Sequence, residues 1–404
     1  MQPLNDIRSH FPALSRLHNG KPLVFMDGPG GTQVPTSVIN SISDYYKTSN
    51  SNTHGVFITT QETDQVMTEM REHVAALLGA ENGHTISIGQ NMTTLNFALA
   101  RGIGRLLQPG DEILITQLDH EGNRGPWLSL RERGIIVREV RLQADGTLDY
   151  GDMESKLTDR TRLMAMGMAS NAIGTVNDIK VARQLTYRTG TWLLLDAVHY
   201  APHFSIDVQA MGCDFLLCSA YKFYGPHVGL LYSRPGLLDG IPTDHLRTAG
   251  QAAPDKIETG TLNHAALAGV TQAVRFISEL GNGKNLREKL VQAYETIGTH
   301  ERALAVKLYD GLAALPSVGI VGTPFKSGVL RAPTVSFLHA TKSAEAVCRH
   351  LAAANICAWD GHFYAQRAIE ILGLLESGGV TRLGISAYNT NQEIDAVLEA
   401  VASV

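Results

Sequence analysis

The chain has 404 residues, which is too long for one ordinary hydrophobic core and fits two domains. Hydrophobic residues make up 44% and charged residues 18%, so the composition supports a sizeable buried core and excludes wholesale disorder. The formal net charge is -5 and the sequence has no basic cluster, so we expect no nucleic-acid binding.

Targeting and cysteine signals are weak. The first twenty residues lack a basic segment followed by an apolar stretch, and the apolar runs are too short to cross a bilayer. The four cysteines show no paired spacing, so we expect neither a disulfide framework nor a metal site. We therefore expect a cytoplasmic protein that does not contact the membrane.

Hydrophobic periodicity predicts alternating strands and helices over the first two thirds of the chain. Residues 1–20 indicate a short helix and an arm, and helices follow at 36–48 and 62–79. The strand-like runs are 84–88, 112–116, 135–140, 163–168, 191–196, 215–219 and 228–233, with helical stretches at 93–107, 122–133, 152–158 and 178–188. This alternation predicts right-handed crossovers and an α/β domain with a mainly parallel sheet, buried on both faces.

The last third has a different pattern, which predicts a smaller α+β domain. One long helical stretch spans 264–313. After it we expect strands at 334–338, 356–358 and 380–386, and helices at 342–354, 363–375 and from 391. The predicted organisation is an N-terminal arm at 1–20, a large domain at 21–290 and a small domain at 291–404.

Two charged residues stand at the ends of predicted buried strands. Asp196 ends one strand. Lys222, which is 26 residues further along the chain, follows the next strand. In an α/β sheet these ends open into the ligand crevice. A buried carboxylate there needs a cation such as a protonated ring nitrogen, and a desolvated lysine is a good nucleophile. The same spacing also fits a helix-capping Asp196 and a Lys222 that extends to solvent.

Several ordered motifs make the chain resemble the class V aminotransferases, closest to the cysteine desulfurase and selenocysteine lyase group. The resemblance runs nearly from end to end. Its motifs are FMDGPGGTQVP (25–35), SNTHG (51–55), GDEILITQLDHEGN (110–123), ASNAIGTV (169–176), the Asp196 and Lys222 segment (193–232), ETGTLN (258–263) and RLGISAYNT (382–390). The resemblance implies the fold type I of enzymes that use pyridoxal 5′-phosphate (PLP).

The resemblance also implies roles for residues around the PLP ring. Lys222 would form the Schiff base and move the Cα proton, and Asp196 would keep the pyridine nitrogen protonated. His120 would stack on the ring face. Asn171 and His199 would lie near the 3-hydroxyl side, where family members often carry Gln in place of His199. We expect His203 to be a surface or loop residue.

The phosphate and the substrate carboxylate would need their own donors. A turn before a helix offers backbone N–H groups to an anion, and Arg382 would pair with the α-carboxylate of an amino-acid substrate. Thr261 resembles the residue that reaches the phosphate of a neighbouring subunit, which implies a homodimer. The candidate phosphate donors are Asn91, Met92, Thr93, Ser219 and Tyr221.

The pattern breaks where desulfurases carry their persulfide-forming cysteine. Tyr364 stands at that position and Trp359 at the position of the usual loop arginine. A phenol cannot accept sulfur as a thiolate does, and Cys357 reads as a small buried residue. His362 and Tyr364 could contact the substrate or simply pack the loop.

We therefore expect a PLP enzyme that acts on an amino acid, as a C–S or β-elimination lyase rather than a persulfide-forming desulfurase. The alternatives are an aminotransferase or epimerase of the same class, a non-catalytic PLP-binding protein, and a sulfur carrier that uses Cys357.

Overall fold

Seven strands form the central sheet of the computed structural model, which describes residues 4–404. Residues 1–3 of the predicted arm lie outside the described residues. The sheet order is β4 (Ile86–Gly89), β10 (Gly229–Ser233), β9 (Phe215–Ser219), β8 (Trp192–Asp196), β7 (Thr161–Gly167), β5 (Glu112–Thr116) and β6 (Ile136–Val140). Only β10 runs antiparallel to its neighbours, so the predicted α/β fold with a mainly parallel sheet is confirmed.

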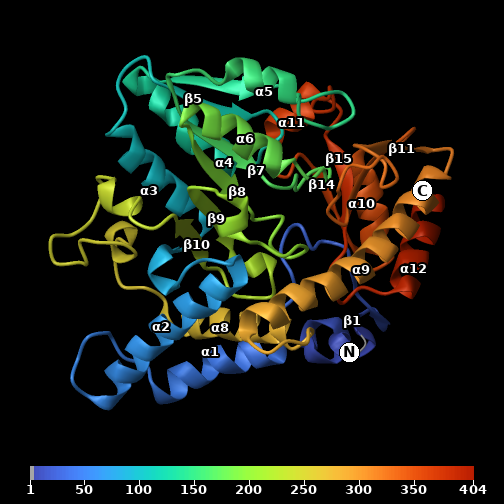
Figure 1. The fold of residues 1–404 in the computed structure, drawn as a ribbon. Helices are drawn as coiled ribbons and strands as arrows, with labels where there is room; N and C mark the ends of the chain where they lie inside the picture. Colours follow the sequence, from blue (N-terminus) through green and yellow to red (C-terminus); the bar gives the residue numbers. More distant parts are fainter. Residues whose placement is uncertain (1–3) are drawn as a thin grey trace.

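Helices cover both faces of this sheet (Figure 1). Successive strand residues point to opposite faces, so Leu193 and Leu195 join one core while Leu194 joins the other. The first core contains residues of α2 (Ile58–Leu78), α5 (Tyr150–Lys156), α6 (Ile179–Thr189) and α8 (His264–Ser278). The second contains residues of α3 (Met92–Gly104) and α4 (Glu121–Leu128). Double-sided burial explains the nearly continuous apolar runs of the strands.

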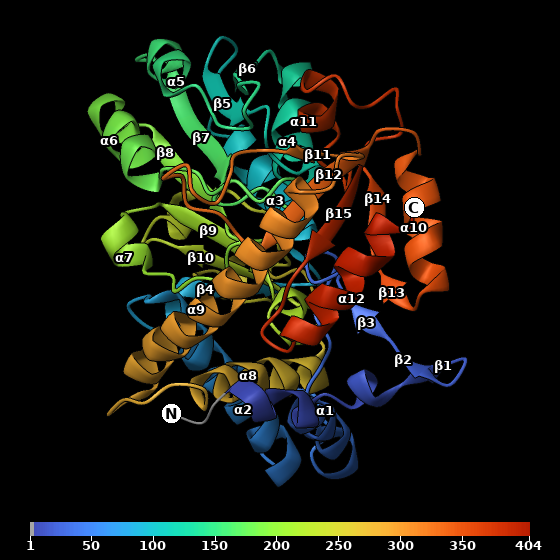
Figure 2. The same cartoon turned by 90° about the vertical axis from the view of Figure 1, so that its right-hand side faces the viewer.

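The C-terminal part forms a separate four-stranded antiparallel sheet (Figure 2). Two edge strands, β11 (Val318–Val321) and β14 (Trp359–Gly361), were not predicted, because they are too short to show a periodic pattern. The third core packs beneath this sheet. The other elements here are β12 (Thr334–His339), β15 (Val380–Gly384), α9 (Leu286–Ala313), α10 (Ala344–Ala353), α11 (Gln366–Ile371) and α12 (Asn391–Ala402).

The predicted long helix at 264–313 is wrong, because the chain breaks between α8 and α9. A Cβ on Gly281 would lie 2.1 Å from the carbonyl oxygen of Lys289, and one on Gly283 would lie 2.6 Å from the Lys289 nitrogen. Only glycine allows this close approach of two backbone segments. Asn285 then starts α9 by accepting a hydrogen bond from the Glu288 N–H at 2.9 Å.

The chain crosses between the two parts twice. Strand β3 (Val24–Phe25) pairs in parallel with β13 (Ile356–Cys357), and Met26 is buried in the C-terminal core (Figure 2). Along α9, Ile297 packs in the core of the large sheet, and Leu304 packs in the core of the small one. The domain boundary predicted at residue 290 falls within α9 and stays a proposal. Helix α1 (Thr36–Thr48) packs against α8.

Among residues 4–404, no helix is both long enough and apolar enough to span a bilayer.

Candidate active site

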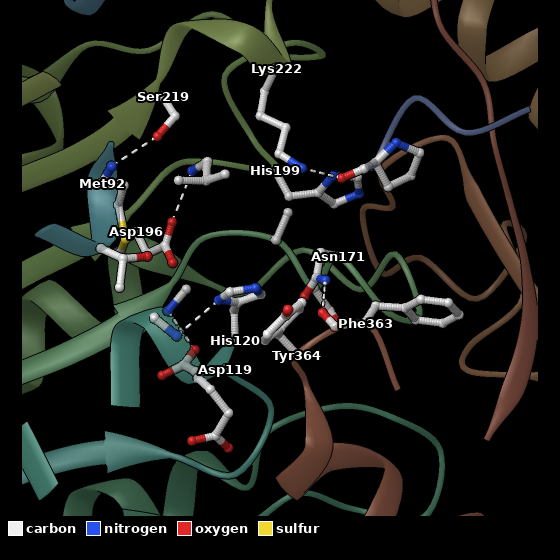
Figure 3. A pocket seen from close by; sticks show the side chains of 18 of the residues that line it. Met92, Asp119, His120, Asn171, Asp196, His199, Ser219, Lys222, Phe363 and Tyr364 are labelled. Carbon is white, nitrogen blue, oxygen red and sulfur yellow. Dashed lines mark hydrogen bonds between the residues drawn. The ribbon is translucent and has the colours of Figure 1, made fainter. Parts of the chain in front are cut away.

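A cavity of about 890 Å³ opens at the carboxyl ends of β8 and β9, where ligands bind in open α/β sheets. Its walls come from both parts of the chain, the large part with the seven-stranded sheet and the small part with the four-stranded sheet. The large part contributes strand ends and the starts of α3 and α4. The small part contributes Trp359, Phe363, Tyr364 and Arg382. Figure 3 shows Lys222, Asp196 and His120 arranged around one space within this cavity.

Asp196 is the last residue of β8 and is buried at 7% exposure. Its Oδ1 accepts a hydrogen bond from the Val198 N–H at 2.9 Å. Burial, and then the negative charge of Asp119, raises the pKa of Asp196 to about 7 although this hydrogen bond opposes the shift. The carboxylate has no ion-pair partner among the described residues, so the site suits a cation from outside the chain.

Lys222 ends a short 3₁₀ turn, Ala220–Lys222, which follows β9 directly. Its Nζ donates to the carbonyl oxygen of Pro29 and lies 4.8 Å from the ring centre of Tyr221. Burial, and then the positive charge of Arg382, lowers the pKa of Lys222 to about 7. At 8% exposure the side chain does not extend into bulk solvent. The alternative interpretation of a solvent-seeking lysine is therefore wrong.

His120 is the N-cap of α4, and its Nδ1 accepts a hydrogen bond from the Gly122 N–H at 2.9 Å. Burial lowers its pKa to about 4, and the charges of Lys222 and Arg382 add to the shift. The ring is therefore neutral near pH 7, with its hydrogen on Nε2. This flat neutral ring is available for stacking on an aromatic ligand.

Asp119 also lines the cavity, and the sequence interpretation missed it. Its Oδ1 accepts a hydrogen bond from the Gly167 N–H at 2.6 Å, which ties the start of α4 to the end of β7. Burial raises its pKa to about 6. The signal was available in the sequence, because an acidic residue directly precedes the proposed stacking histidine.

His199 is buried, and its Nε2 lies 3.0 Å from the Thr334 Oγ1. Its Nδ1 has no hydrogen-bond partner among the described residues, and burial lowers its pKa well below the usual value. The ring of His203 lies 5.3 Å from the ring of His199, and the His203 Nδ1 is 2.8 Å from Glu301 Oε2. Of the expected surface or loop position, His203 lies in a turn but not at the surface, because its contact with α9 leaves only 3% of it exposed.

The turn before α3 lines one wall of the cavity. The Asn91 side chain caps the helix by accepting from the Thr94 N–H at 2.9 Å. The Met92 N–H donates to Ser219 Oγ at 3.0 Å, which leaves the Ser219 hydroxyl hydrogen free to donate elsewhere. Thr93 lines the same wall. Tyr221 and His227 also line the cavity, and their rings stack with centroids 4.5 Å apart.

Arg382 projects from β15 and is 4% exposed. Its guanidinium lies 3.9 Å from the ring centre of Phe363 and donates to the Asn171 carbonyl oxygen at 3.0 Å. The amide of Asn171 in turn donates to the Phe363 carbonyl oxygen at 2.8 Å. Burial lowers the pKa of Arg382 to about 9. The sequence interpretation missed Phe363, which only the fold brings over the guanidinium.

The loop after β14 bends sharply at the cavity mouth. Phe363 and Tyr364 adopt left-handed backbone angles, with φ of 53° and 57°. The Tyr364 carbonyl oxygen accepts from the Glu121 N–H at 2.6 Å, and its ring lies 5.6 Å from that of His120. His362 is not among the lining residues, and its Nδ1 instead accepts from the Tyr364 N–H at 3.2 Å.

Thr261 lies outside the main cavity, in an exposed turn. It lines a neighbouring hollow together with Gln90, and Thr94 and His227 border both hollows. All other predicted site residues except His362 line the main cavity.

Comparison with known proteins decides the family. The sequence profile of the aminotransferase class-V family matches residues 24–397. The chain belongs to the class-V aminotransferase family. The predicted fold type I is thereby confirmed, and the chain is a PLP-dependent enzyme.

Similar class-V aminotransferases carry the name cysteine desulfurase. A probable cysteine desulfurase of Mycolicibacterium paratuberculosis is 34% identical over 98% of this chain, which spans 58% of that relative's length. A cysteine desulfurase of Serratia proteamaculans is 30% identical over 100% of this chain and 98% of its own. The crystal structure of a cysteine desulfurase from Escherichia coli superposes with a TM-score of 0.86, at 26% identity, over 100% and 98% of the two chains.

The residues in the cavity of this class-V aminotransferase fit its cofactor. The buried carboxylate of Asp196 lines the same cavity as the buried amine of Lys222, whose pKa is lowered. A helix start with a neighbouring hydroxyl lies on one wall, and such helix starts favour phosphate. Together these groups match a protonated pyridine nitrogen, an aldehyde and a phosphate.

Proposed function

We propose that this enzyme is a C–S or β-elimination lyase that acts on an amino acid, rather than a persulfide-forming desulfurase. One observation carries the proposal. Tyr364 occupies the loop position of the usual cysteine at the cavity mouth, and no cysteine of residues 4–404 lines the cavity. Cys357 lies on β13, and burial raises its thiol pKa, which disfavours the thiolate.

Lys222 and Asp196 would hold the cofactor in our proposal. Lys222 Nζ would form the imine link to its aldehyde, and Asp196 would pair with its ring nitrogen. His120 would stack on one face of the ring, and Asn171 and His199 would lie at its 3-hydroxyl side. Bound in this way, the cofactor supplies an electron sink that stabilises negative charge at the substrate Cα. The phosphate would lie against Asn91, Met92, Thr93, Ser219 and Tyr221.

Arg382 would bind the substrate carboxylate. Its planar guanidinium offers two parallel N–H donors, and the negative charge of Asp27 acts on it without a salt bridge within 4 Å among the described residues. Phe363 and Asn171 hold the guanidinium in place. The amino group of a substrate fixed in this way would face Lys222, with Tyr364 between the reacting carbons and solvent.

Lys222 would then move the Cα proton. A pKa of about 7 allows its amine to take up a proton near neutral pH. The Cβ–S bond breaks, and its electron pair leaves with sulfur, which takes a proton to become a thiol. Hydrolysis of the remaining enamine balances the reaction, so that one cysteine thioether and one water give one thiol, one pyruvate and one ammonium ion.

The second candidate is an aminotransferase or epimerase of the same class. The match to the aminotransferase class-V family favours this candidate. Neither transamination nor epimerisation needs a loop cysteine. Pyruvate and thiol formed in equal amounts without a keto acid support the lyase. Amino-group transfer to an added keto acid, or inversion at Cα, supports the alternative. A protein whose cofactor absorbance responds to no amino acid is a non-catalytic PLP-binding protein.

We further propose a cytoplasmic homodimer in which Thr261 completes the neighbouring site. The α1–α2 connection exposes Val56 at 93% and Phe57 at 60%, and such apolar surface at a loop tip suits burial against another chain. Thr261 lies in an exposed turn outside its own main cavity. The four cysteines are unpaired thiols, which supports a reducing compartment.

Borohydride reduction followed by peptide mass analysis tests the cofactor assignment. We expect a pyridoxyl mass on the Lys222 peptide of the wild-type holoenzyme and none in Lys222→Ala. Lys47→Ala, which alters an exposed lysine, is the matched control and should label like wild type. Labelling elsewhere, or none in wild type, contradicts the assignment. Analysis of products from an amino-acid panel then decides the reaction type.

A further inference from the structure

Two aromatic side chains of the small part, Trp359 and Tyr364, hold neither the cofactor nor the carboxylate in our proposal. Trp359 and Tyr364 line the cavity and are 52% and 70% exposed. By the resemblance to desulfurases, Trp359 stands at the position of their loop arginine and Tyr364 at the position of their persulfide-forming cysteine. This chain therefore presents two large, partly exposed ring surfaces to the cavity.

These rings are held in place by the fold. Trp359 pairs with Arg382 in the register of β14 and β15, and its Nε1 lies 3.2 Å from the position of a Cβ built on Gly30. The hydrogen bond from the Glu121 N–H to its carbonyl oxygen fixes the backbone of Tyr364. The Tyr364 ring lies 5.6 Å from the ring of His120. A binding surface that is ordered in advance loses little entropy when a ligand packs against it.

The charged residues that line the cavity already have partners or assigned roles, so few of them could pair with a polar substrate side chain. Asp119 accepts backbone hydrogen bonds, and Glu121 pairs with Arg124 at 3.2 Å. Lys222, Asp196 and Arg382 are assigned to the cofactor and the substrate backbone. The cavity volume of about 890 Å³ lies near the upper end for sites that enclose drug-sized ligands, so it can hold the cofactor and a large substituent.

We propose that the substrates are S-substituted cysteines whose sulfur carries an aromatic or extended apolar group, packed between Trp359 and Tyr364. The inference rests on the proposed lyase function. Thioether sulfur makes favourable contacts with aromatic rings, and an aromatic substituent buries the exposed ring surface of both residues. Cysteine itself leaves these rings uncovered.

Cofactor absorbance during rapid mixing of the holoenzyme measures the affinity directly, independently of turnover. The ligands are L-cysteine, S-methyl-L-cysteine, S-benzyl-L-cysteine and S-(2-aminoethyl)-L-cysteine. We expect S-benzyl-L-cysteine to bind at least about tenfold more tightly than S-methyl-L-cysteine, as burial of a phenyl group predicts. In Trp359→Ala and Tyr364→Ala this ratio should fall toward one, and Tyr364→Phe should keep it. Tyr187→Ala, which removes a 74% exposed ring on α6, is the matched control.

Three results overturn the inference while the lyase proposal stands. The first is equal binding of the benzyl and methyl compounds, and the second is tightest binding of the aminoethyl compound. The third is a Tyr364→Ala variant that keeps the ratio and instead weakens dimerisation, since the ring would then be covered by a second copy of the chain. If no amino acid changes the absorbance, the proposed function itself fails.

Discussion

At the scale of residues, buried ionisable groups surround the cavity and also lie behind it. Glu301 is 1% exposed on α9, and its Oε2 lies 2.8 Å from His203 Nδ1. Burial raises its pKa, although His203 opposes the shift. Such a pair depends on both members, because either one alone would be a buried group without its partner.

Glu301→Ala should lower the free energy of unfolding by about 3 kcal/mol or more, because it leaves His203 unpaired in the core. Glu301→Gln keeps a hydrogen-bond acceptor at the same place and should cost less than half as much. Urea unfolding of both variants, followed by circular dichroism, measures the difference. Equal losses in the two variants would mean that packing, and not the hydrogen bond, makes Glu301 important.

His120 makes the stability of the apoprotein depend on pH. Its pKa is lowered to about 4 by burial, while an unfolded histidine titrates near 6.5. The unfolded state therefore binds more protons as pH falls from about 6.5 to 4, and the folded state loses on the order of 3 kcal/mol over that range. His120→Phe keeps a flat ring and should remove this part of the pH dependence. Thermal unfolding of the apoproteins between pH 4 and pH 8 provides the measurement, and an unchanged slope would contradict the assignment.

Single residues show where sequence interpretation ends. Lys222 and Asp196 could be placed near each other, because Asp196 ends one buried strand, Lys222 follows the next, and the carboxyl ends of such strands meet at one place. His203 could not be placed, because its partner Glu301 is 98 positions away and the contact exists only once α9 packs on the turn. Phe363 could not be found for the same reason, since nothing in its loop indicates an arginine on β15.

At the scale of elements, buried five-residue strands are predictable from the sequence, whereas the short edge strands β11 and β14 and breaks within helical patterns are not. Strands β5 and β9 match their predicted ranges, because each is a five-residue buried run. The helix predicted at 122–133 ends as α4 at Leu128 and continues as a 3₁₀ segment, Ser129–Arg133. The break between α8 and α9 was hidden, because apolar spacing continues on both sides of two glycines.

Gly281→Ala should destabilise the protein by about 2 kcal/mol, within the range for substitutions that force backbone apart. The added methyl group would lie 2.1 Å from the Lys289 carbonyl oxygen at the start of α9. Gly240→Ala is the matched control, since a Cβ there meets nothing within 4 Å. Chemical unfolding should separate the two variants, and equal stabilities would show that the turn relaxes without strain.

At the scale of the whole molecule, the site is shared between the two parts of the chain. The large sheet supplies Lys222 and Asp196, and the small sheet supplies Arg382. The fold class and the second α+β unit could be predicted from the order of elements. The return of residues 24–26 to the C-terminal core could not, since a two-residue strand such as β3 carries no pattern.

The proposed homodimer makes a prediction at this scale. Phe57→Glu places a charge on the apolar loop tip and should shift the protein toward monomer, because burying that charge is unfavourable. Sedimentation velocity over a range of concentrations measures the shift. Leu246→Glu alters another exposed apolar side chain, 61% exposed, and serves as the control. A wild-type protein that sediments as a monomer at all concentrations would refute the dimer.

The single antiparallel strand of the large sheet has a consequence for how the protein is made. Strand β4 lies at the sheet edge, and its neighbour β10 is translated about 140 residues later. Their register packs Gly229 so tightly on Asn91 that an added Cβ would lie 2.3 Å from the Asn91 carbonyl carbon. A nascent chain must therefore be synthesised and released from the ribosome as far as residue 233 before the turn at Asn91 can settle against β10. We expect vitamin B6 capture to begin only after that point in synthesis.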